Sequence, residues 1–123
     1  FSLQNSTVGM NENIALGNQA MQDAVQGSYN IAVGNNALQS LSGANADYNI
    51  GIGERAITQL QNGTANIGIG RRALARSTVA NNNVAIGDSA LFLNQTGQNN
   101  TAVGSKAAYK LTNSSHVVAV GYE

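Results

Sequence analysis

Large and small apolar residues alternate in a short pattern that recurs along the whole chain. An asparagine is followed by an aliphatic residue, a small residue, a second aliphatic residue and a glycine, as in Asn83-Val84-Ala85-Ile86-Gly87. Clear copies begin 17 residues apart, with one interval of 19, and degenerate copies begin at residues 5 and 117; the clear copies start at Asn13, Asn30, Asn49, Asn66, Asn83 and Asn100. Because this regularity spans residues 1–123, the sequence predicts one repeat domain.

Each five-residue copy predicts a short strand. Its two large aliphatic residues are two positions apart and so point to one face, while the alanine or glycine between them points to the other. The closing glycine ends the strand where the chain must bend. One strand and one return segment in every 17 residues predict a mainly β fold, a parallel β-solenoid whose stacked coils bury a continuous apolar stripe.

The return segments carry a second apolar pattern. An alanine and an aliphatic residue are followed three or four positions later by another aliphatic residue, as in Ala37-Leu38 with Leu41. This spacing predicts one or two helical turns in each return segment, often closed by a glycine such as Gly43. A short irregular or β segment satisfies the same spacing.

Equivalent positions of stacked coils lie above one another, so repeated polar residues predict ladders. The asparagines that open the copies are expected to join neighbouring coils by hydrogen bonds between their side-chain amides. A structural role is likewise expected for the closing glycines, because neither a Lys-Ser/Thr pair nor a long helix follows them as in a phosphate loop; these are Gly17, Gly34, Gly53, Gly70, Gly87 and Gly104.

The small residues in the middle of the strands leave one strand face nearly flat. Such a face suits close packing against a neighbouring chain or against the return segment of the same chain. Both alternatives are open from the sequence; the residues are Ala15, Ala32, Gly51, Gly68, Ala85 and Ala102.

Charged residues next to the closing glycines give the first candidate binding site. Glu54, Arg71 and Asp88 alternate in sign on successive coils and predict a surface charge ladder of little worth for stability. Arg55 and Arg72 occupy the next position and are neighbours of like sign. They are either two solvated arginines or a site for an anion, such as an anionic sugar or a lipopolysaccharide phosphate.

Two tyrosines give the second candidate. Tyr29 and Tyr48 precede the asparagine in successive copies, so their rings are expected to stack. An exposed tyrosine pair can offer a platform to the face of a sugar, or it can simply cover the rod. The candidate surface-binding residues are therefore Tyr29, Tyr48, Arg55, Arg71 and Arg72.

Composition argues against several other classes of function. Charged residues make up 10% of the chain and its formal net charge is zero, so no attraction to nucleic acid is expected. With no cysteine, one histidine and six scattered carboxylates, we expect no enzyme, no metal site and no cofactor. Because no apolar run approaches about 20 residues, we expect no membrane insertion by this segment. Both ends fall within the repeat pattern, so we expect a fragment of a longer fibrous protein.

The repeat resembles sequences of known families. The stretch Asn83-Val84-Ala85-Ile86-Gly87-Asp88-Ser89-Ala90 resembles the head repeats of trimeric autotransporter adhesins of the YadA type. The stretch Thr96-Gly97-Gln98-Asn99-Asn100-Thr101-Ala102-Val103-Gly104 resembles more closely the repeats of bacteriophage tail-fibre and tail-spike proteins. The resemblance implies a β-roll, left-handed in the adhesin heads, a homotrimer, and an extracellular role in attachment.

We therefore expect a structural or receptor-binding segment of a trimeric phage tail fibre, whose partners are copies of itself and a glycan or protein receptor on the host cell surface. An adhesin head on a bacterial surface that binds host matrix or cells is the second hypothesis. A passive rod-like spacer, with recognition elsewhere in the protein, is the third. An enzymatic role would need carboxylates from different chains to meet at a trimer interface, as in some tail-spike glycosidases.

Overall fold

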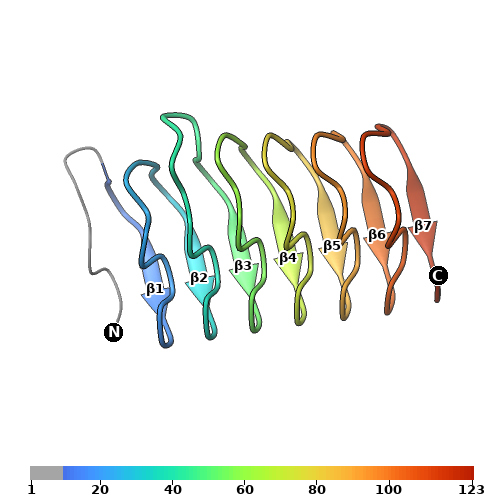
Figure 1. Cartoon of the computed structure of the whole chain (residues 1–123), viewed down its shortest axis with the longest axis horizontal. Coiled ribbons are helices and arrows are strands. Elements are labelled where there is room, and N and C mark those ends of the chain that lie inside the picture. The colour runs from blue at the N-terminus through green and yellow to red at the C-terminus, as the bar shows by residue number, and fades with distance from the viewer. Residues whose placement is uncertain (1–9) are drawn as a thin grey trace.

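The computed structural model describes residues 10–123, which form a rod of stacked coils (Figure 1). Seven parallel strands form one sheet in chain order, so the predicted β-solenoid is confirmed. The copy that begins at Asn5 lies outside the described residues. The strands are β1 Ile14–Leu16, β2 Ile31–Val33, β3 Ile50–Ile52, β4 Ile67–Ile69, β5 Val84–Ile86, β6 Thr101–Val103 and β7 Val118–Val120.

The strands pair in the register that the repeat predicts. Ile50 pairs with Ile67, Gly51 with Gly68, and the same positions pair at every step of the sheet. The two extra residues between β2 and β3 leave this register unchanged, since Ala32 still pairs with Gly51. Figure 1 shows the extra length as a loop that rises above the neighbouring coils between β2 and β3. The insertion therefore alters one edge of the rod and not its sheet.

The return segments are not helical, and the prediction of helical turns is wrong for the described residues. Each return segment is a series of turns, and many of its backbone N–H groups donate to a neighbouring coil. The N–H of Ile57 donates to the carbonyl of Ala73 at 2.9 Å, and that of Leu74 to the carbonyl of Ala90 at 3.0 Å. An α-helix would use these groups within one segment. The irregular segment that the spacing also allowed is what forms.

A left-handed backbone explains how the return segment turns its aliphatic side chains inward without a helix. Ile57 and Leu74 have φ angles of 48° and 52°, and Leu91 has one of 50°. These β-branched and bulky residues rarely adopt positive φ, because Cβ approaches the following carbonyl. The same conformation recurs from coil to coil, where hydrogen bonds to the neighbouring coils and burial of the side chain offset its cost.

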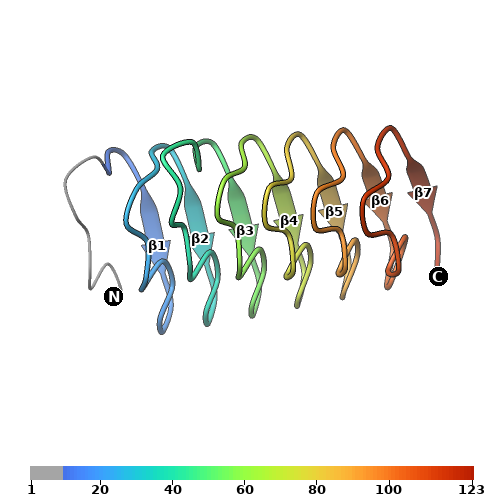
Figure 2. The same cartoon turned by 45° about the horizontal axis from the view of Figure 1, so that its top comes forward.

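The core lies between the return segments and the small strand residues. Figure 2 shows the strands in one layer, with the return segments running alongside in a second layer. The largest apolar side chains that are fully buried all come from the return segments: Met21, Leu38, Leu41, Ile57, Leu60, Leu74 and Leu91. The strand contributes its middle residue, and Ala32, Ala85 and Ala102 are fully buried there.

Close contact across this core decides what the flat strand face packs against. A Cβ atom on Gly68 would lie 2.8 Å from Cγ1 of Ile57, and one on Gly51 would lie 3.1 Å from Cγ of Leu38. The small residues therefore pack against the return segment of the same chain and not against a neighbouring chain. As a consequence, the large aliphatic residues of the strands point away from the core.

A buried ladder of asparagines joins the coils next to the strands. The Nδ2 group of Asn66 donates to Oδ1 of Asn49 at 3.0 Å and to the carbonyl of Ala80 at 2.7 Å. Its Oδ1 atom accepts from the backbone N–H and from Nδ2 of Asn83, both at 3.1 Å. Each such amide thus closes its own coil and also binds the coils before and after it. Side chains at this position are almost wholly buried in Asn30, Asn49, Asn66, Asn83 and Asn100.

Replacing Asn66 by alanine is expected to lower the free energy of unfolding by on the order of 3 kcal/mol, because it removes the side-chain partner of the buried carbonyl of Ala80 and of the backbone N–H of Asn83. Chemical denaturation followed by circular dichroism measures this loss. Asn35→Ala is the matched control, since Asn35 is exposed and its loss should cost less than about 0.5 kcal/mol. Equal losses of unfolding free energy in the two variants would show that a ladder asparagine contributes no more to stability than an exposed one.

The glycines that close the strands stack as a second ladder. Gly70 has a φ angle of 127°, and a Cβ atom there would lie 2.5 Å from the carbonyl oxygen of Gly87. Neither the backbone angle nor the space accommodates a side chain.

We expect Gly70→Ala to destabilise the chain by at least about 2 kcal/mol, from backbone strain and from the clash with Gly87 together. The melting temperature measures the effect. The reverse change, Ala65→Gly, is the control, because exposed Ala65 holds a φ angle of 55° that glycine adopts without strain. A melting temperature of the Gly70→Ala variant equal to that of the wild type would contradict the close approach of the coils.

Candidate functional site

The outer side of the sheet is an apolar surface that nothing in the described residues covers. The two outward side chains of each strand form two columns along the rod, which we call the aliphatic face. In the middle of the rod Ile52, Ile69 and Ile86 are 37%, 36% and 39% exposed. Every residue of the aliphatic face except Thr101 is apolar. The face consists of Ile14, Leu16, Ile31, Val33, Ile50, Ile52, Ile67, Ile69, Val84, Ile86, Thr101, Val103, Val118 and Val120.

Contiguous apolar surface of this kind marks an interaction site in a soluble protein. None of the binding residues predicted from the sequence lies on this face, yet the sequence contains a signal for it. Each return segment already supplies large aliphatic residues, and a thin coil has room for only a small residue opposite them. The strand aliphatic residues therefore had to point outward.

The two tyrosines lie together on the surface, and their predicted stacking is confirmed. The rings of Tyr29 and Tyr48 are 5.0 Å apart between centroids and 3° from parallel. They are 44% and 59% exposed. The same coil position holds Glu12 before them and Ala65 after them, so the stacked platform is two rings long.

The charge ladder contains one close pair. Nε and Nη2 of Arg71 donate to the two carboxylate oxygens of Asp88, each at 3.1 Å. These hydrogen bonds, followed by the charge of Asp88, raise the pKa of Arg71 above its ordinary value, and Glu54 adds a smaller attraction. The side chains of Arg71 and Asp88 are 53% and 38% exposed, so water screens the pair and it adds little stability. Because Asp88 occupies its guanidinium group, Arg71 is a weaker binding candidate than the sequence suggested.

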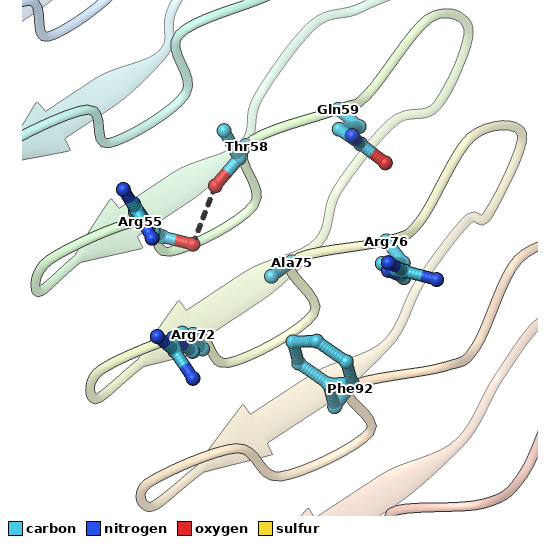
Figure 3. Close-up of a pocket in the computed structure, with 7 residues that line it drawn as sticks. All are labelled: Arg55, Thr58, Gln59, Arg72, Ala75, Arg76 and Phe92. Atoms are coloured by element: carbon cyan, nitrogen blue, oxygen red, sulfur yellow. Dashed lines mark hydrogen bonds between the residues drawn. The ribbon is translucent and has the colours of Figure 1, made fainter.

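Arg55 and Arg72 line a surface hollow of about 280 Å³ (Figure 3). Its remaining walls are Thr58, Gln59, Ala75, Arg76 and Phe92, and all seven residues come from return segments. The hydroxyl group of Thr58 donates to the carbonyl of Arg55 at 2.6 Å. Three arginines thus surround one hollow, and no acidic side chain lines it.

Arg76 and Phe92 were not identified from the sequence. The Cζ atom of Arg76 lies 5.7 Å from the centroid of the Phe92 ring, a cation–π contact. On its other side Phe92 stacks on Tyr109, with centroids 5.1 Å apart and the rings 3° from parallel. The signal was their spacing: Arg76 follows Arg72 by four residues, and Phe92 and Tyr109 are one coil apart.

The side chains offer no grouping of metal ligands in the described part of the chain. No three histidine, cysteine, aspartate or glutamate residues come close enough to hold an ion among residues 10–123. No helix of the length and apolarity needed to cross a bilayer occurs among the same residues.

Comparison with protein-family models, with curated proteins and with solved structures gives no match to this chain. Its function is therefore inferred from the aliphatic face, the tyrosine pair and the arginine-lined hollow.

Proposed function

We propose that this chain is a rod-like, receptor-binding segment of a homotrimeric phage tail fibre that attaches the particle to its host cell. The observation that carries the proposal is the aliphatic face, an uncharged apolar surface that runs along the whole described sheet. A rod exposed to water needs a partner on such a face.

Another copy of the same chain is the partner that fits best. The face repeats once per coil, and each coil places one strand in register with the next. A covering partner must follow this repeat over the length of the rod to bury it, and a parallel copy does so by symmetry. The number three and the left-handed coil come from the resemblance to phage fibres and adhesin heads.

Attachment is supported by the surface that remains outside such a trimer. The arginine-lined hollow is built from return segments, so a neighbour seated on the strands leaves its walls free. The exposed stack of Tyr29 and Tyr48 adds an aromatic surface of the kind that sugars bind. In a passive spacer neither feature would have a ligand.

The native mass should be close to three times the 12.7 kDa of one chain when measured by light scattering after size exclusion. The double substitution Ile52→Lys and Ile69→Lys should reduce it to the mass of one chain, because charged groups would then face each other in the trimer interior. Circular dichroism should remain that of the wild type, since neither side chain contributes to the buried core.

The control for this experiment is Gln61→Lys, which adds charge at an exposed position of a return segment and should leave the mass unchanged. A wild-type mass of one chain would overturn the trimer for this segment. A dimeric mass would retain the aliphatic face as the interface but replace the threefold arrangement.

Fluorescently labelled protein should bind intact bacteria of a susceptible host and should not bind strains that lack the surface glycan. Cell-associated fluorescence across a panel of strains measures this binding. Binding to animal cells or matrix and not to bacteria would instead favour an adhesin head. Absence of binding to every surface, from a protein shown to be trimeric, would identify a spacer.

A further inference from the structure

We propose that the hollow between Arg55, Arg72, Arg76 and Phe92 binds one anionic sugar residue of a surface glycan, an inference that rests on the proposed attachment function. The guanidinium groups would hold the carboxylate, sulfate or phosphate group, and the Phe92 ring would contact the apolar face of the sugar ring. The proposal thus specifies which class of ligand the rod binds during attachment and where on the rod it binds.

The hollow exists because one coil departs from the repeat. The fifth residue after the closing glycine points outward and forms a ladder along the rod. The coil of β4 carries the smallest residue of this column, Ala75, between Thr58 and Phe92. In the other coils the position holds Gln22, Gln39, Thr58, Phe92 and Tyr109. In the coil of β2, by contrast, Oε1 of Gln39 accepts from Nδ2 of Asn36 at 3.0 Å. Loss of the long side chain at Ala75 opens a gap one coil wide.

Positive charge in the hollow is not neutralised within the described residues. The ion pairs found in residues 10–123 are Arg71 with Asp88 and Lys110 with Glu123. Arg55 and Arg72 occupy equivalent positions on adjacent coils, and Arg76 approaches from the same return segment as Arg72. Like charges at such neighbouring sites repel, and an anion between them relieves the repulsion. Guanidinium groups also match carboxylate and phosphate oxygens in pairs.

The aromatic wall makes the site suited to a sugar and not only to a bare anion. One face of the Phe92 ring is covered by Tyr109, and the other is directed at the coil of β4. Arg76 lies over this second face, 5.7 Å from the ring centroid, and the short side chain of Ala75 leaves space beside it. A sugar in the hollow would therefore contact the part of the ring that Arg76 leaves open while its anionic group meets the guanidinium group. Figure 3 shows Phe92 on the side of the hollow opposite Arg55, with Ala75 and Arg72 between them. A volume of about 280 Å³ accommodates a single monosaccharide and leaves neighbouring residues of the chain outside.

Isothermal titration calorimetry of the native protein at low ionic strength tests the site. Trigalacturonic acid, a carboxylate sugar, and mannose 6-phosphate are the anionic probes, and maltotriose is the neutral one. We expect binding of at least one anionic probe and none of maltotriose. Inorganic phosphate alone should bind at least tenfold more weakly than the anionic sugar that binds, since it cannot contact Phe92.

Two substitutions at the hollow should each weaken binding by about tenfold or more. Arg72→Gln removes a charged hydrogen-bond donor. Ala75→Gln fills the gap with the residue that the chain itself carries at this position in Gln22 and Gln39, so the fold should tolerate it. The matched control is Arg71→Gln, which removes the same charge one residue away from the hollow and should change affinity less than twofold.

Failure of both anionic probes to bind the wild type would overturn the inference. So would equal losses from Arg71→Gln and Arg72→Gln, which would indicate general charge attraction, or an unchanged affinity in Ala75→Gln. These outcomes are separate from failure of the fibre proposal, which is judged by native mass and cell binding. A trimer that binds cells with an inactive hollow would use another surface, such as the tyrosine pair.

Discussion

Hydrogen bonding between successive coils is the interaction on which the rest of this structure depends. The strand and the return segment both donate their backbone N–H groups to neighbouring coils, and the asparagine side chains add a third line of bonds between them. Each coil can neither shift nor tilt without breaking all three. Equivalent residues are therefore held above one another over the whole rod, and every sequence position becomes a column on its surface or in its core.

The thinness of the coil is the second constraint, and it determines which surface seeks a partner. The interior holds the aliphatic side chains of the return segment and, opposite them, an alanine or glycine of the strand. A larger residue at Gly68 would displace Ile57. The large strand residues must then lie outside, where they supply apolar area that a chain of this size would otherwise bury. The single chain thus stabilises its coils internally, but it leaves the apolar outer side of its sheet uncovered.

Much of this architecture could be predicted from the sequence because a period of 17 residues constrains every coil at once. The strands, their register and the amide ladder follow from aligning the copies, since an asparagine repeated at each coil lies next to its equivalents in the coils before and after it. The return segments could not be assigned in the same way. Leu38 and Leu41 have a spacing that suits a helix, but left-handed residues such as Leu38, with a φ angle of 46°, reach the same core positions. Spacing alone does not distinguish the two backbones.

The hollow illustrates a different limit and suggests how a repeat protein acquires a specific site. Uniform columns present the same chemistry at every coil, so they can bind an extended partner but cannot select one place along the rod. Selection needs a departure from the repeat, and Ala75 is such a departure in a column of larger side chains. Comparing copies identifies that position, yet the hollow forms only because Arg55, Arg72 and Phe92 come from three different coils that the stacking brings together. The stacking of coils that stabilises the rod thus also allows one short side chain, Ala75, to create a binding site from residues of three coils.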